Sequence, residues 1–279
     1  MSASIEQGDL YQALQLFKTQ HARAKKKGDI AQAIELAYRG ANLMLEKNEV
    51  NAGSELARDF IELLKSQSEV NYDKVLQEVI TIDSNFAKLE GDEALRERKR
   101  FLKAAIDFTA ERGPWTSGDS ELHRLASLAA LKEQDIMLAT KHMLHAHRPD
   151  ELAAMLVKWA KLGPESERDL YLARAVLQLL CLENLRDANA VNKAFRAEFP
   201  DLDTPLLRFI GYLLRTLERD AYPLFQVLRS KYAPSIARGT TQTSSFDAYL
   251  DKIASVFYGV AAPKSGMASM MESLMKGLF

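Results

Sequence analysis

A segment that repeats after about twenty residues limits the fold of this chain more than any other feature. GDLYQALQLF (8–17) and GDIAQAIELA (28–37) share Gly-Asp, Gln-Ala and a following leucine, and NAGSELARDF (51–60) is a weaker third copy. In the first two copies the apolar residues fall at i, i+3, i+4 and i+7, which is one face of an α-helix. Asp29 suits a helix N-cap, and Gly28 suits the end of the preceding helix. Such a repeat is typical of helical pairs that stack side by side.

Helical periodicity continues to about residue 260, and Gly-Pro or Pro breaks separate its segments. We therefore predict an all-α protein, a right-handed α-solenoid of stacked helical hairpins of the TPR/HEAT-like class, with about 13 helices. It forms a single elongated domain over residues 1–262, with an irregular Thr/Ser-rich segment at 237–246. Residues 263–279 are expected to be a linker followed by a short amphipathic, Met-rich helix.

Composition excludes several classes of protein. The 279 residues carry a formal charge of -1, so the basic excess typical of nucleic-acid binders is absent. The only cysteine, Cys181, excludes an internal disulfide framework. The start of the sequence does not have the pattern of a signal peptide, and the most apolar stretches are interrupted by arginines. We expect a soluble protein from a reducing compartment.

The residue types that support catalysis or metal binding are few. KHMLHAHRPD contains His142, His145 and His147, but no Asp, Glu or Cys stands at a recognised ligand spacing, so a structural histidine pair is the preferred interpretation over a metal site. Cys181 lies on an apolar helical face and is interpreted as a buried small hydrophobe rather than a nucleophile. Phosphate-binding loops and the G-x-S-x-G motif are absent. We expect no enzyme activity, no metal and no cofactor.

Two charged stretches have two interpretations each. The first helix ends with Lys18, Arg23 and Lys25–Lys27, which either complement the helix dipole as hydrated side chains or form a basic patch for an acidic partner. RERKR (96–100) is expected to be a solvated helix face. Composition alone favours the hydrated interpretation of both.

Several stretches resemble one known family in order along the chain. GDLYQALQLFKT resembles the opening G-D-Y-Y-E-A-H-Q-x-Y-R-T of the Golgi-to-ER traffic protein 4 family, and AYRGANLMLEKNEVNAGSELA resembles its second hairpin. RAVLQLLCLENLRDANAV is similar to the family's A-V-L-Q-x-L-C-L-x-N motif. YPLFQVLRSKYAPSI and YLDKIASVFYGVAAP are similar to two stretches nearer the C-terminus.

The resemblance implies a cytosolic adaptor without catalytic activity that acts in delivery of tail-anchored membrane proteins to the endoplasmic reticulum. The N-terminal half, about residues 1–150, is then expected to bind the homodimeric targeting ATPase, of the Golgi-to-ER traffic protein 3 family. The C-terminal half, about residues 151–262, is expected to bind a ubiquitin-like protein of the Golgi-to-ER traffic protein 5 family, which recruits a client-bearing co-chaperone. The alternative is a helical-repeat structural subunit of a larger assembly.

The same resemblance suggests contact residues. Lys18 stands where the family motif has Arg, while Leu10, Leu14, His21 and Ala24 depart from the motif. The candidates for binding the ATPase are Tyr11, Gln15, Lys18, Thr19, Arg23, Asp73 and Glu78, the last two as an acidic regulatory contact. The ubiquitin-like partner is expected at about residues 190–262, with five aromatic candidates that could equally be core residues: Phe195, Phe199, Phe209, Tyr212 and Phe225.

The C-terminal stretch GMASMMESLMKGLF places Met267, Met270, Met271, Leu274 and Leu278 on one helical face. It is too short to span a bilayer and has too few cations for a membrane foot. We expect this tail to pack on the last helices of its own solenoid, as a removable cap, or on a partner.

Overall fold

The computed structural model describes residues 10–239 and 245–260, and every regular element in these two ranges is helical. The predicted all-α class is therefore confirmed. The Met-rich tail and the middle of the irregular segment at 237–246 lie outside the described residues. The chain forms two compact units, unit 1 (residues 1–146) and unit 2 (residues 147–279).

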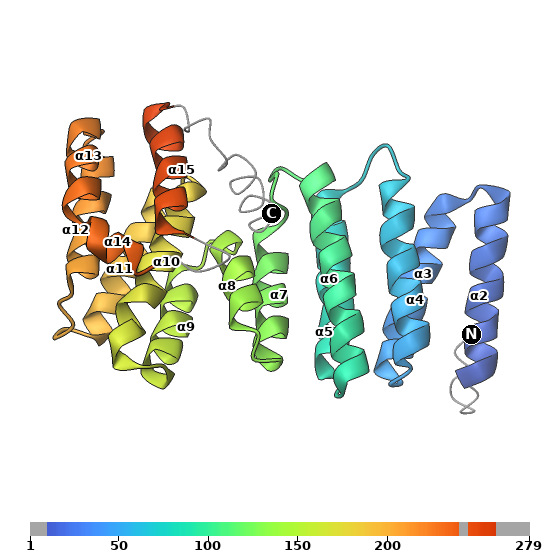
Figure 1. Ribbon diagram of the computed structural model, residues 1–279. Helices are drawn as coiled ribbons and strands as arrows, with labels where there is room; N and C mark the ends of the chain where they lie inside the picture. Colours follow the sequence, from blue (N-terminus) through green and yellow to red (C-terminus); the bar gives the residue numbers. More distant parts are fainter. Residues whose placement is uncertain (1–9, 240–244, 261–279) are drawn as a thin grey trace. The chain divides into compact units, whose positions relative to one another are not determined.

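Unit 1 is a stack of helices in which each helix packs on neighbours one or two places along the chain (Figure 1). The core formed by the repeated segments combines small and large apolar side chains. Ala33, Ala37 and Ala41 are fully buried, together with larger residues such as Phe17 and Phe60. The helices are α2 (Leu10–Lys27), α3 (Ile30–Glu46), α4 (Val50–Lys65), α5 (Tyr72–Lys88), α6 (Asp92–Arg112), α7 (Ser120–Lys132) and α8 (Ile136–His145).

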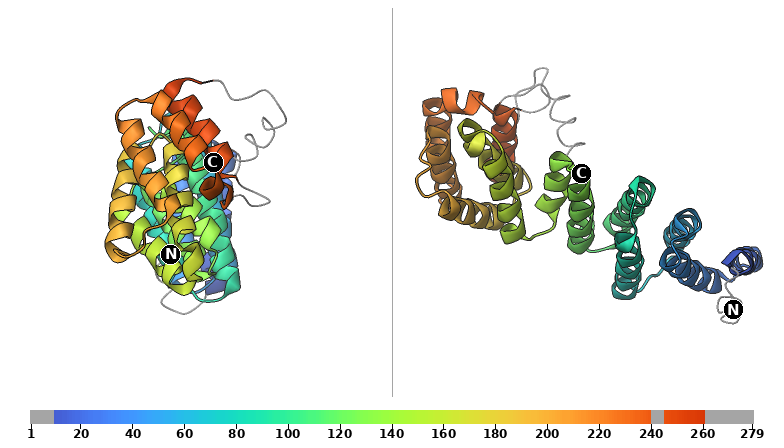
Figure 2. Two further views of the ribbon diagram at one scale, coloured as in Figure 1. Left: turned by 60° about the vertical axis from the view of Figure 1, so that its left-hand side comes forward. Right: turned by 90° about the horizontal axis from the view of Figure 1, so that it is seen from below.

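Unit 2 also begins as a helical stack, but its last long helix returns to the middle of the unit. α15 packs on α10, which precedes it by about 70 residues, and Figure 2 shows the two side by side. Gln178 Nε2 of α10 donates to Tyr249 Oη of α15 at 3.2 Å. The helices are α9 (Pro149–Leu162), the short 3₁₀ helix η1 (Glu165–Glu167), α10 (Arg168–Cys181), α11 (Leu185–Glu198), α12 (Pro205–Glu218), α13 (Tyr222–Lys231), α14 (Ala233–Ala237) and α15 (Phe246–Tyr258).

Five of the turns between consecutive helices have the same construction. In each, a residue with positive φ directly precedes the N-cap of the next helix, and the N-cap backbone N–H donates to the carbonyl five residues earlier. This is the Schellman arrangement, which satisfies carbonyls at the end of one helix while the next begins. The left-handed residues are Gly28, Asn48, Gln134, Glu183 and Asp220, and only the first was predicted from the sequence.

The RERKR stretch corrects one prediction, because its central arginine is in the core and not on a solvated face. Arg98 is buried, and its guanidinium binds Asp83 of α5 with both arms: Nε to Oδ1 at 2.7 Å and Nη2 to Oδ2 at 2.8 Å. Arg100, in contrast, is exposed as predicted. A charged residue at an inward helix position enters the core when a carboxylate faces it, and that partner lies on another helix.

None of the helices in the described part of the chain combines the length and the apolar character needed to cross a bilayer.

Candidate protein-binding surfaces

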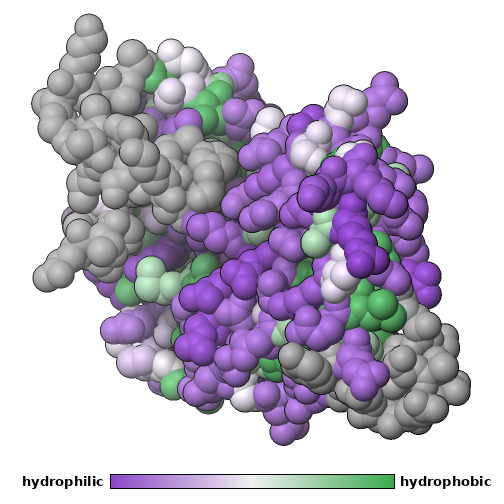
Figure 3. Space-filling model, turned by 90° about the vertical axis from the view of Figure 1, so that its right-hand side faces the viewer, coloured by the Kyte–Doolittle hydropathy of each residue, from purple (hydrophilic) through white to green (hydrophobic). Residues whose placement is uncertain are grey.

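The first candidate surface is the outer face of α2. Ala13, Phe17 and His21 point into unit 1 and are buried, as their spacing predicted. Gln15 and Thr19, together with Arg23, follow at i, i+4 and i+8 on the opposite side and are exposed. Figure 3 looks at the molecule from the side of α2 and shows a largely hydrophilic surface with small hydrophobic patches. Tyr11 lies within α2, but its side chain is outside the described part of the structure.

Lys18 is held within unit 1, and this distinguishes it from the other cations of α2. Its Nζ donates to Glu55 Oε2 of α4 at 2.6 Å. One turn on, His21 Nδ1 lies 3.7 Å from Asp59 Oδ2. Burial lowers the pKa of His21, an effect that Asp59 opposes and Lys25 reinforces. The exposed basic group of α2 therefore consists of Arg23, Lys25, Lys26 and Lys27.

The acidic candidates lie at the start of α5. Asp73 is exposed in the first turn, where a carboxylate interacts favourably with the helix dipole. Glu78 is half-buried, with Lys74 Nζ 3.5 Å from its Oε1. Burial is the main cause that raises the pKa of Glu78; nearby Glu35 of α3 adds to the rise and Lys74 opposes it. Glu78 of α5 and Glu35 of α3 thus lie near each other, with Lys74 paired to Glu78, while Asp73, five residues earlier, lies on a different side of α5.

Three histidines of unit 1 form a buried cluster that differs from the predicted one. His123 of α7, which the sequence reasoning missed, takes the place of His147. Its Nε2 donates to the Ser117 carbonyl at 2.8 Å, so its Nδ1 accepts from His142 Nδ1 at 3.0 Å. The His145 ring lies 4.8 Å from that of His123, measured between centroids. His142 and His145 therefore each contact His123.

Burial keeps His123 and His142 neutral. It lowers the pKa of His123 to about 3, with further lowering by the neighbouring histidines and Lys141 and a partial opposing effect of the Ser117 carbonyl. It lowers the pKa of His142 to about 4, with Lys141 and His145 acting in the same direction. Among residues 10–239 and 245–260, no group of three or more His, Cys, Asp or Glu side chains is arranged to hold a metal ion.

The aromatic candidates of unit 2 divide into core and surface. Phe195, Phe209 and Phe225 are buried, so the prediction that they contact a partner directly is corrected in favour of their alternative role as core residues. Phe199 is half-buried at the end of α11, packs on Phe195 and lies beneath the cations of Lys161 and Arg168. Tyr212, on the outer side of α12, is 46% exposed. Helical spacing alone does not separate these positions, because each helix of the unit packs on more than one neighbour.

Cys181 has the buried position predicted for it. Its thiol lies at the end of α10, 3.5 Å from the Tyr249 carbonyl, to which it donates. Burial raises the pKa of this thiol to about 12, against a lowering by Lys252, so it stays protonated at neutral pH.

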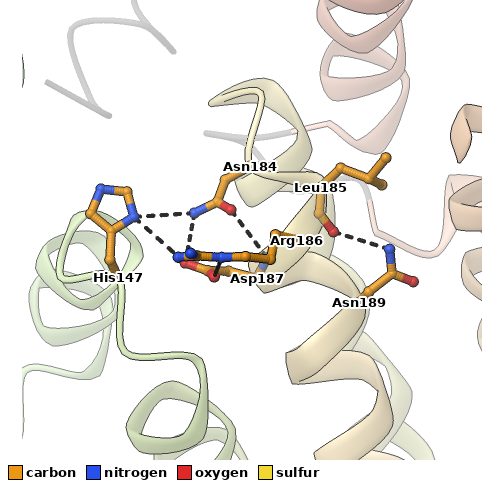
Figure 4. Close-up of polar contacts among 6 residues, drawn as sticks. All are labelled: His147, Asn184, Leu185, Arg186, Asp187 and Asn189. Atoms are coloured by element: carbon orange, nitrogen blue, oxygen red, sulfur yellow. Dashed lines mark hydrogen bonds and ion pairs between the residues drawn. The ribbon is translucent and has the colours of Figure 1, made fainter.

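The stretch after Cys181 forms a capping network (Figure 4). Asn184 is the N-cap of α11: its Oδ1 accepts from the Asp187 backbone N–H at 3.1 Å, and its Nδ2 donates to Asp187 Oδ2 at 2.7 Å. Arg186 Nε donates to Asp187 Oδ1 at 2.9 Å, and His147 Nδ1 lies 3.6 Å from Asp187 Oδ2. Asp187 is buried by these contacts. The C-L-x-N motif therefore joins α10 to α11 and leaves its polar groups paired.

A family model described as "GET4: Golgi to ER traffic protein 4" matches residues 27–279. The chain belongs to this family. A Golgi to ER traffic protein 4 homolog from Oryzias latipes is 32% identical over 287 residues, covering 99% of this chain and 86% of the relative. A homolog from Dictyostelium discoideum is 36% identical over 179 residues, and Protein GET4 from Arabidopsis thaliana is 39% identical over 177 residues. The matches to these two cover 63% and 60% of this chain, and the chain spans only 57% and 53% of their lengths.

The fold of this Golgi to ER traffic protein 4 family member agrees with a solved structure. A structure titled "Crystal structure of C. therm. Get4" superposes with a TM-score of 0.79 at 25% sequence identity, over 96% of this chain and 90% of that chain. The resemblance seen in the sequence is thus confirmed.

Sequence reasoning on this family member missed one surface. Leu224 and Val227 of α13 are 51% and 60% exposed, and half-buried Leu228 adjoins them. They lie within YPLFQVLRSKYAPSI, one of the stretches that carry the family resemblance. Their spacing of i, i+3 and i+4 is the signal that could have found them, but it is identical to that of a core face.

Proposed function

We propose that the protein is an adaptor in the delivery of tail-anchored membrane proteins to the endoplasmic reticulum. It bridges the homodimeric targeting ATPase and a ubiquitin-like protein that recruits the client-bearing co-chaperone. The observation that carries the proposal is the family match over residues 27–279, which covers unit 2 and the part of unit 1 that follows α2. We further propose that it acts in the cytosol and that its role is binding without catalysis. The protonated, buried thiol of Cys181 is consistent with that role.

In this proposal the ATPase binds the outer face of α2. Gln15, Thr19 and Arg23 present an amide, a hydroxyl and a guanidinium on one exposed stripe, and Lys25–Lys27 extend its positive charge. Such a stripe suits a polar, acidic partner surface and speeds encounter by electrostatic steering. Lys18 contributes less directly, because its ammonium is already paired with Glu55. The carboxylates of Asp73 and Glu78 are assigned a separate, regulatory contact with the same ATPase.

The ubiquitin-like partner binds unit 2 in this proposal. Of the five aromatic residues named for it, Phe199 and Tyr212 retain surface that a partner can cover. Exposed tyrosine is frequent among the residues that dominate binding energy, because its ring buries a large apolar area and its hydroxyl keeps a polar partner. Tyr212 also packs near Tyr232, with ring centroids 6.5 Å apart, so its ring is supported on one side.

Two substitutions should separate the two binding activities. Arg23→Glu should weaken ATPase binding by roughly tenfold, which corresponds to about 1.4 kcal/mol, and leave the ubiquitin-like protein bound as before. Tyr212→Ala should weaken binding of the ubiquitin-like protein by about tenfold or more and leave ATPase binding as before. Titration of each purified partner by calorimetry or fluorescence anisotropy measures both, and circular dichroism checks that helical content is retained.

Matched controls come from exposed residues that are not among the contact candidates for the partner being tested. Lys193→Glu reverses an exposed charge on α11 and should leave ATPase affinity unchanged. Leu162→Ala truncates an exposed apolar residue at the end of α9 and should leave the ubiquitin-like partner bound. If the wild-type chain binds neither partner, the adaptor proposal is refuted. If it binds both but the two variants bind normally, only the assigned surfaces are wrong.

A further inference from the structure

The outer side of α13 carries an apolar surface that no described helix of unit 2 covers. We call it the α13 stripe: Leu224, Val227 and Leu228, spaced at i, i+3 and i+4. The first two side chains are more than half exposed. Phe225, on the inner side of the same helix, is buried, so α13 packs against unit 2 through a face that does not include the stripe. A single exposed leucine needs no explanation, but two large apolar side chains one turn apart on a ten-residue helix form a ready contact surface.

The chain leaves the described fold beside this helix. Tyr258, the last residue of α15, has its ring 5.1 Å from that of Tyr222 and 5.6 Å from that of Phe225, between centroids. Its hydroxyl donates to the Thr216 carbonyl of α12 at 3.5 Å. Gly259 then ends α15 in the left-handed conformation. The last described residues, Gly259 and Val260, therefore follow directly on a residue that packs against the first turn of α13.

Those residues have the composition and the length to reach the stripe. Residues 261–266 can span up to about 20 Å when extended, and thirteen residues as a helix measure about 20 Å, against about 15 Å for α13. The pattern of Met267, Met270, Met271, Leu274 and Leu278 puts flexible apolar side chains on one helical face. Methionine adapts to shallow, irregular surfaces better than branched residues do.

We propose that the tail, residues 267–279, binds the α13 stripe of its own chain through its methionine-rich face. The tail lies outside the described residues; the exit point of the chain beside α13, the reach of residues 261–266 and the matching apolar character favour it as the occupant of the stripe. The inference does not rest on the proposed adaptor function, and its test uses neither partner. Because the link is covalent and short, the effective concentration of the tail at the stripe is in the millimolar range, so a weak contact suffices.

Trypsin tests this proposal, because Lys276 lies within the tail and Lys264 lies in the preceding linker as an internal reference. Docking should slow cleavage after Lys276 relative to cleavage after Lys264, when initial rates are followed by mass spectrometry on the full chain. Val227→Asp should raise the Lys276 rate by about tenfold, as expected for a loss of about 1.4 kcal/mol in docking. Met271→Asp should do the same from the other side of the contact.

The control is Leu162→Asp, because Leu162 is another exposed apolar residue of unit 2 and is 70% exposed. It should leave the Lys276 rate unchanged. Hydrogen exchange gives a second readout: a chain ending at residue 262 should exchange faster over 222–231 and equally over 149–162. Unchanged cleavage and exchange in the stripe variants would overturn the proposal. So would a dimer in analytical ultracentrifugation that Val227→Asp converts to monomer, since a second copy would then be the occupant.

Discussion

Replacing Arg98 by methionine should lower the free energy of unfolding of unit 1 by roughly 3–5 kcal/mol, the range for removal of one partner from a buried ion pair. The substitution leaves the Asp83 carboxylate buried among apolar side chains with neither of its guanidinium hydrogen bonds. The loss comes from that uncompensated charge rather than from the attraction between the two groups. Urea unfolding, followed by circular dichroism, measures the change.

Two further variants separate this explanation from a simple packing effect. The double variant Asp83→Leu with Arg98→Met removes both charges and should recover most of the stability, because a buried ion pair gains little over apolar side chains of similar volume. Arg96→Met removes an exposed cation two residues away on the same helix, and should change stability by less than about 0.5 kcal/mol. If the double variant is as unstable as Arg98→Met alone, the loss of stability comes from altered packing and not from the unpaired charge of Asp83.

Acidification should destabilise unit 1 through its histidine cluster. The pKa values of His123 and His142 in the folded protein, about 3 and about 4, lie below the ordinary value of 6.5. Below pH 6.5 these histidines are therefore protonated in the unfolded chain but remain neutral in the folded chain. Proton binding then favours the unfolded state, so the free energy of unfolding is highest above pH 6.5 and decreases as the pH falls. Lowering the pH from 7.5 to 5.5 should reduce the free energy of unfolding by about 1.4 kcal/mol for each of the two histidines, or roughly 3 kcal/mol together.

Urea unfolding at pH 7.5 and pH 5.5 measures this loss in a range above the ordinary titration of carboxylates. His142→Asn keeps an N–H donor toward His123 but cannot titrate, so it should remove about half of the pH dependence. His147→Asn, which alters an exposed histidine in unit 2, should leave the dependence intact. His21, whose pKa is also lowered, adds a loss of the same sign. Equal stability at the two pH values would mean that the cluster accepts protons without cost.

The fold class could be predicted from the sequence because helical periodicity and chain breaks are local signals. Ala33 and Ala37 are buried where their spacing placed them, and Asp29 caps α3 by accepting from the Gln32 backbone N–H. The return of α15 onto α10 could not be predicted, because the contact between Gln178 and Tyr249 joins residues 71 apart and leaves no periodic trace.

The candidate surfaces were predicted less well, for the same physical reason. Whether Phe209 or Tyr212 faces outward depends on which neighbouring helices cover α12, and helical spacing carries no information about that cover. Arg98 and His123 were missed because each is brought into the interior by a group on another segment, Asp83 and the Ser117 carbonyl. Pairing across segments decides the burial of polar groups, so a list of charges along the chain does not predict it.

The five shared turns have a consequence for where this architecture can change length. Each turn already uses the fewest residues that end one helix and cap the next, and its N-cap amide is committed to a carbonyl of the preceding helix. An inserted residue breaks that bond and shifts the start of the following helix away from the position in which its apolar face packs. The longer connections, residues 66–71 and 199–204, have no such constraint. Additions to the chain are therefore accommodated in these connections, while the five short turns keep a fixed number of residues.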